Sequence, residues 1–82
     1  MFKMDYLTAL KVIEVTEKKL AEDEKWLPRL YSEKMIAQTK IGIELNKKTI
    51  ESLRARLPQL KEEYKKAEIA RLTAEIERIK NL

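Results

Sequence analysis

Helix-breaking residues are rare in this chain, which has two prolines and one glycine among 82 residues. The prolines share one frame, since Leu27-Pro28-Arg29-Leu30 and Leu57-Pro58-Gln59-Leu60 both read Leu-Pro-x-Leu. Proline fixes its own φ, lacks an amide donor and disfavours helix at the preceding residue, so each Leu-Pro step predicts a helix boundary. We therefore expect three helices of similar length, at about 3–26, 29–56 and 59–81.

The composition favours a small, single, all-α domain spanning residues 1–82. Charged residues make up 39% of the chain and hydrophobic residues 44%, while strand-favouring valine, threonine and aromatic residues are few. A chain of this length buries only about 60% of the surface that its unfolded form exposes. Cysteine and histidine are absent, so disulfides and thiolate or imidazole metal sites cannot add stability. We therefore expect the chain to form a homo-oligomer.

Apolar residues recur at helical spacing in all three segments. The last segment has the clearest pattern, with apolar residues three, four and three positions apart as in a coiled-coil seam. Glu17 and Glu24 lie beside the stripe of the first segment, where we expect weaker packing or pairing with cations. The predicted core or oligomer seam consists of Leu10, Ile13, Leu20, Ile41, Leu45, Leu53, Leu60, Ile69, Leu72, Ile76 and Ile79.

Small or polar residues lie on or beside the apolar face of the middle segment, namely Gln38, Gly42, Thr49 and Ser52. Small residues on a packing face would let another helix approach closely. The alternative is that Gly42 is merely tolerated in its helix, at a cost of about 1 kcal/mol relative to alanine.

Two architectures agree with these patterns. Three helices of about 25 residues would each be about 38 Å long and well matched for antiparallel packing in a three-helix bundle. Neither Leu-Pro step, however, has the glycine, asparagine or aspartate that usually ends one helix and caps the next. A proline can instead kink a continuing helix, which would make residues 29–82 one bent rod in a two-helix hairpin whose exposed seam dimerises or trimerises. We favour the three-helix bundle, with Pro28 as the better marked of the two turns.

The residues required for common catalytic and cofactor chemistry are missing. Without histidine there is no ordinary base near neutral pH, and one glycine cannot form a phosphate-binding loop. The carboxylates of Glu22-Asp23-Glu24 and Glu62-Glu63 point about 100° apart on a helix and do not converge on a metal ion. We expect no enzyme activity, no cofactor and no metal. The chain also shows no apolar leader and no stretch that would span a membrane, so we expect a cytoplasmic protein.

Two groups of residues are candidates for contacting a partner. Seven of the ten charged residues at positions 29–57 are basic, and a basic edge is formed by Lys40, Lys47, Lys48, Arg54 and Lys61. This edge would suit a phosphate backbone or an acidic protein. Glu44 and Glu51 interleave with it at helical spacing, however, and we expect them to pair with Lys40, Lys47 and Lys48 and to dilute its charge. Trp26 and Tyr31 flank the first proline, where they would plug the end of the bundle or anchor a protein partner.

These observations predict a non-enzymatic interaction or adaptor protein. It would self-associate through apolar helix faces and present charged faces to a macromolecular partner, whose identity the residues do not indicate. The alternative is a small, basic, regulatory nucleic-acid-binding protein that uses the basic edge of the middle segment.

Overall fold

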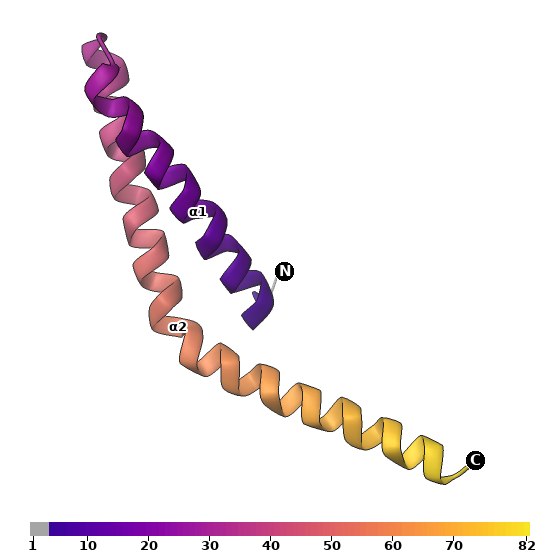
Figure 1. Ribbon diagram of the computed structural model, residues 1–82. Coiled ribbons are helices and arrows are strands. Elements are labelled where there is room, and N and C mark those ends of the chain that lie inside the picture. Colours follow the sequence, from indigo (N-terminus) through magenta and orange to yellow (C-terminus); the bar gives the residue numbers. More distant parts are fainter. Residues whose placement is uncertain (1–3) are drawn as a thin grey trace.

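The chain folds as a long helical hairpin, described here for residues 4–82 from a computed structural model (Figure 1). Within this range the α-helices are α1 (Tyr6–Trp26, 21 residues) and α2 (Glu33–Lys80, 48 residues), joined through the short 3-10 helix η1 (Leu27–Arg29). The expected start of the first helix at residue 3 lies outside the described residues. The expectation of an all-α fold is confirmed, and the hairpin is elongated, with extents of 69 × 22 × 20 Å.

Side-chain caps begin both α-helices. The Asp5 carboxylate accepts a hydrogen bond from the Thr8 amide at 2.7 Å, and the Ser32 hydroxyl accepts one from the Met35 amide at 3.4 Å. Such caps satisfy amides that have no partner within the helix. The hydrogen bond from Thr8 also lowers the pKa of the Asp5 carboxyl below its ordinary value.

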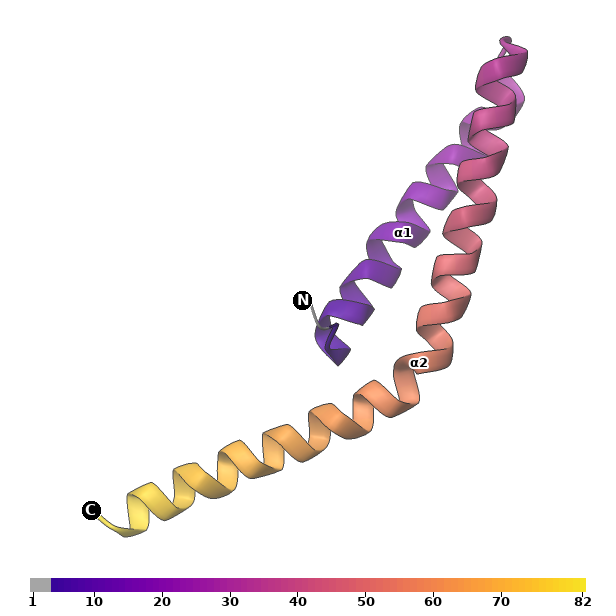
Figure 2. The same ribbon diagram turned by 180° about the vertical axis from the view of Figure 1, so that it is seen from behind.

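Pro28 lies in η1 at the turn between the two α-helices, as expected, but Pro58 lies inside α2. Proline cannot donate to the carbonyl of Arg54, four residues earlier, and it crowds that turn, so the helix bends rather than ends. Figures 1 and 2 show this bend where the colour of α2 passes from salmon to orange. The structure is thus the kinked two-helix hairpin, and the separate helix expected at 59–81 is the distal half of α2.

The bend keeps the distal half of α2 in contact with the start of α1. In both views α1 lies inside the angle formed by the two halves of α2 (Figures 1 and 2). Leu60 follows the proline and is buried, and the ring of Tyr64 lies 5.7 Å from the ring of Tyr6, centroid to centroid. These contacts partly offset the roughly 3 kcal/mol that a proline costs within a helix.

The two helices pack along one seam whose residues alternate three and four positions apart. We call it the hairpin seam. Its residues on α1 are Tyr6, Ala9, Ile13, Thr16, Leu20 and Asp23, continued by Leu27 of η1, and its residues on α2 are Ile43, Asn46, Ile50, Leu53, Leu57, Leu60 and Tyr64. Every one of these residues is buried or half-buried. Ile13, Ile50 and Leu53 form its central cluster. Two helices can bury little more than this, and no large side chain among residues 4–82 is fully enclosed.

The predicted core residues divide into two groups. Ile13, Leu20, Leu53 and Leu60 lie on the hairpin seam. The prediction was wrong for Leu10, Ile41 and Leu45, which are 39%, 61% and 58% exposed and are not part of its core. On α2 the place of Ile41 and Leu45 is taken by Ile43, which is only 6% exposed and was not predicted. Ile41 and Leu45 are four residues apart and share one face of the helix, whereas Ile43 lies about 160° away from each. Apolar residues thus occur on two nearly opposite faces, and their spacing alone did not identify the buried one.

Candidate interaction surface

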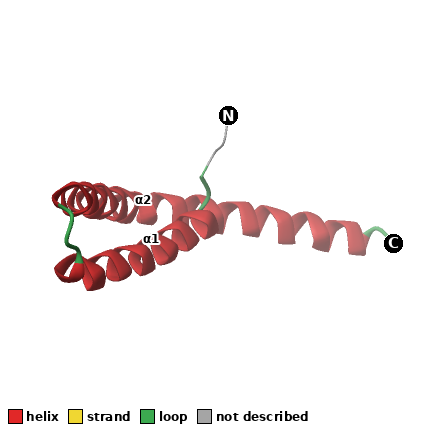
Figure 3. Ribbon diagram, turned by 90° about the horizontal axis from the view of Figure 1, so that it is seen from above, coloured by secondary structure: helices red, strands yellow, loops and turns green. Residues whose placement is uncertain are grey.

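The distal arm, which we define as residues 65–80 of α2, extends past the N-terminal end of α1 (Figure 3). Only Glu68 among these residues is half-buried, and all the others are exposed. The exposed residues include the distal stripe, which consists of Ile69, Leu72, Ile76 and Ile79. These four side chains remain 49% to 63% exposed. An exposed apolar row of this kind marks a surface that gains free energy when another apolar surface covers it.

The distal stripe lies on a different face of α2 from the hairpin seam. Leu72 and Ile76 follow Leu60 by 12 and 16 residues, which rotates them by about 120° and about 160° at about 100° per residue. Continuing the hairpin seam at its spacing of three and four would instead place Arg71 and Arg78 on the face toward α1. The apolar face of α2 therefore changes sides beyond Tyr64, and α1 would not cover the distal stripe even if α1 were longer.

Charged residues border the distal stripe. The carboxylates of Glu68 and Glu75 lie 3.0 Å and 2.5 Å from the guanidinium groups of Arg71 and Arg78. The hydrogen bond to Glu68 raises the pKa of Arg71 above its ordinary value. These pairs span three residues within one helix, so they support the distal arm as a helix but do not cover its apolar side chains.

The basic edge of the middle segment runs beside the hairpin seam. Arg54 pairs with Glu17 of α1, and the Lys47 ammonium lies 3.8 Å from the Glu24 carboxylate. Glu17 and Glu24 are seven residues apart, as are Lys47 and Arg54, so their spacing matches across the antiparallel hairpin. The expected pairing of Glu17 and Glu24 with cations is confirmed, and Lys47 pairs with α1 rather than with Glu44 or Glu51.

The remaining basic-edge residues, Lys40, Lys48 and Lys61, are exposed and form no ion pair within residues 4–82. The structure thus divides the basic edge into two residues that pair with α1, Lys47 and Arg54, and three lysines that do not. Isolated lysines produce a weaker field than five adjacent cations would, because solvent and salt screen them separately.

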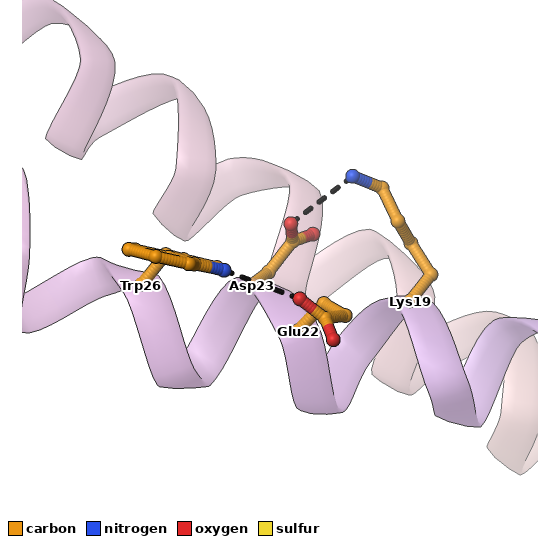
Figure 4. A network of polar contacts seen from close by, with 4 residues as sticks. All are labelled: Lys19, Glu22, Asp23 and Trp26. Atoms are coloured by element: carbon orange, nitrogen blue, oxygen red, sulfur yellow. Dashed lines mark hydrogen bonds and ion pairs between the residues drawn. The ribbon is translucent and has the colours of Figure 1, made fainter.

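Trp26 and Tyr31 do not plug the end of the hairpin, since Trp26 is half exposed and Tyr31 is almost fully exposed. The Trp26 indole donates a hydrogen bond to Glu22 at 3.2 Å, beside a Lys19–Asp23 ion pair at 3.1 Å (Figure 4). The Arg29 guanidinium lies 5.2 Å from the centroid of the same indole ring. Two smaller residues of the turn, Leu27 and Leu30, are half-buried at the end of the hairpin instead.

The hollows along the hairpin are open grooves. One groove is lined by Glu17, Leu20, Lys47, Ile50, Glu51 and Arg54.

A Cβ atom at Gly42 would meet nothing within 4 Å, so this glycine does not provide close helix packing within the chain. Within residues 4–82 no three acidic side chains gather as metal ligands would. No helix in that range combines the length and the apolar content needed to cross a bilayer.

Comparison with known proteins does not assign the chain to a group. No family model, curated protein or solved structure matches it. The four exposed apolar residues of the distal stripe are the candidate interaction surface within residues 4–82.

Proposed function

We propose that the chain is a non-enzymatic interaction protein that self-associates through its distal arm. In this proposal, the distal stripe of one copy packs against the same stripe of a second copy, and the hairpins present their charged faces to a macromolecular partner. The observation that carries the proposal is the row of four half-exposed apolar residues on the face of α2 turned away from α1. A symmetric dimer requires a self-complementary patch, and a straight apolar row on a helix is such a patch.

The exposed area of the distal stripe supports a reversible rather than a permanent complex. Each side chain is already about half covered by its own helix, so complete burial would add about 1 kcal/mol, half of the usual 1.5–3 kcal/mol. Eight such side chains in a dimer give about 8 kcal/mol before the cost of association is subtracted. Lost translational and rotational freedom costs at least about 4 kcal/mol, which leaves about 4 kcal/mol for binding. We therefore expect the stripe to give a dissociation constant of about 1 mM.

Sedimentation velocity over a concentration series from roughly 1 µM to 1 mM tests the proposal. We expect the average mass of the native chain to rise with concentration. The double substitution Leu72→Glu/Ile76→Glu places two carboxylates in the stripe and should keep the protein monomeric. The matched control Ala70→Glu/Ala74→Glu makes the same charge change on the same arm outside the stripe, and it should associate like the native chain.

A native chain that stays monomeric at every concentration, with its helix content intact, would contradict the proposal. Equal association of the two double variants would also count against it, because the distal stripe would then not be the contact surface.

Nucleic-acid binding has no specific support in the geometry of the basic edge. Lys47 and Arg54 face the carboxylates of Glu24 and Glu17, and a phosphate backbone would have to compete with those contacts. We therefore do not adopt it as a second proposed function.

A further inference from the structure

We infer that two distal arms associate in parallel and in register, so that Glu75 of each copy faces Lys80 of the other. This inference rests on the proposed self-association and adds the orientation of the partner. In heptad notation, the distal stripe places Ile69 and Ile76 at a positions, with Leu72 and Ile79 at d positions. The residues bordering the stripe then occupy g positions on one side and e positions on the other.

The two borders carry opposite charges. The g positions hold Glu68 and Glu75, and the e positions hold Lys66, Thr73 and Lys80. In a parallel pair, each g residue faces the e residue five positions further along the partner. Glu75 of one copy then faces Lys80 of the second copy, and the twofold symmetry repeats this pair. Glu68 faces the uncharged Thr73, so no like charges oppose each other along residues 68–80. Toward the bend, Lys65 continues the d positions and Lys66 would face Lys61 of the second copy, so the paired stretch begins at Glu68.

An antiparallel pair over the same apolar residues would bring like charges together. Ile69 would pack against Ile79 of the second copy, and Leu72 against Ile76. In that orientation g faces g and e faces e. Glu75 would face Glu75 at the symmetry axis, and Lys66 would face Lys80 at both ends. Opposed like charges disfavour this orientation relative to the parallel one.

The shape of the hairpin permits the parallel arrangement. α1 lies inside the bend of α2 (Figures 1 and 2), whereas the distal stripe is rotated about 120–160° away from the face that α1 covers. A second distal arm therefore approaches from the side opposite α1. The two hairpins lie at the same end of the paired arms and diverge from each other, because each bends toward its own α1.

Disulfide trapping distinguishes the two orientations, because the native chain contains no cysteine. Ile69→Cys and Ile79→Cys are prepared separately and oxidised in a glutathione buffer, at a concentration where sedimentation shows association. In the parallel pair each cysteine faces its own copy within disulfide distance, so each variant forms a covalent dimer alone. In the antiparallel pair residue 79 is displaced from its own copy by ten residues, about 15 Å along the axis, and only a mixture of the two variants forms the disulfide.

Charge reversal gives a second measurement that does not depend on cysteine. Glu75→Lys should weaken association several-fold in the parallel pair, and adding Lys80→Glu should restore it. In the antiparallel pair the first change merely replaces two facing carboxylates with two facing ammonium groups, so association would not weaken.

Covalent dimers formed only in the mixture of the two cysteine variants would overturn the parallel orientation and leave self-association standing. A monomeric native chain would overturn both proposals.

Discussion

Two leucines on α2 make a sharp test of which face of that helix packs against α1. Leu53 is 6% exposed in the hairpin seam, whereas Leu45, eight residues earlier on the same helix, is 58% exposed. Replacing either leucine with alanine changes helix propensity by the same small amount. The difference between Leu53→Ala and Leu45→Ala therefore reports packing alone.

The size of the difference follows from the exposed fractions. Leucine to alanine removes three carbon atoms, worth about 2.4 kcal/mol at about 0.8 kcal/mol each when fully buried. Nearly all of this is lost at Leu53, and only about two fifths, about 1 kcal/mol, at Leu45. Any cavity left between two helices can close by a small shift, so it adds little. We expect Leu53→Ala to lower the free energy of unfolding by about 1.2 kcal/mol more than Leu45→Ala, about an eightfold difference in the unfolding equilibrium.

Urea unfolding followed by far-ultraviolet circular dichroism measures both variants. The Leu72→Glu/Ile76→Glu background keeps association from adding to the apparent stability, and equal slopes of free energy against urea would confirm that the two variants expose similar surface on unfolding. Equal unfolding midpoints, or a lower midpoint for Leu45→Ala, would show that the hairpin seam has been placed on the wrong face of α2.

Three further predictions concern the ends, the border and the bend of the hairpin. The pKa of the Asp5 carboxyl is lowered in the folded chain, so its contribution to stability is present above the ordinary aspartate pKa and is lost as the pH falls through the lowered pKa. Asp5→Asn keeps a capping oxygen but does not titrate, so it should flatten the acid dependence of Tm. A double-mutant cycle with Glu17→Arg and Arg54→Glu should show each reversal destabilising the hairpin by up to about 1 kcal/mol and the pair restoring it, while additive losses would exclude a direct interaction. Pro58→Ala should straighten α2 and raise the radius of gyration above that of the same monomeric background with Pro58, both measured by small-angle X-ray scattering. An unchanged profile would show that the proline does not cause the bend.

Much of the fold follows from local chemistry along the chain. The scarcity of helix breakers predicted an all-α structure, and Pro28 predicted the turn. The position of Glu17 and Glu24 beside an apolar stripe predicted pairing with cations, which the structure confirms with Lys47 and Arg54. The all-α fold and the turn depend on residues within one or two turns of helix. The ion pairs depend on acidic residues that lie beside a packing face, where a basic residue of the facing helix comes within reach.

The remaining features depend on contacts that spacing does not reveal. Whether Pro58 ends α2 or bends it depends on the balance between the lost hydrogen bond and the contacts that Leu60 and Tyr64 make with α1. The burial of Ile43 was missed because Asn46 follows it on the hairpin seam, so the seam is less apolar there than the exposed face with Ile41 and Leu45. The distal stripe was visible from its spacing, but its rotation away from the hairpin seam has meaning only once α2 is known to be continuous.

The change of apolar face along α2 separates two processes that are inseparable in many small helical proteins. Closure of the hairpin is unimolecular and buries the hairpin seam. The proposed association of two distal arms is bimolecular and buries only residues beyond Tyr64. Dilution would thus dissociate the proposed dimer into monomers and leave each hairpin closed. The cell could then regulate assembly through the abundance of the chain without putting its folded state at risk.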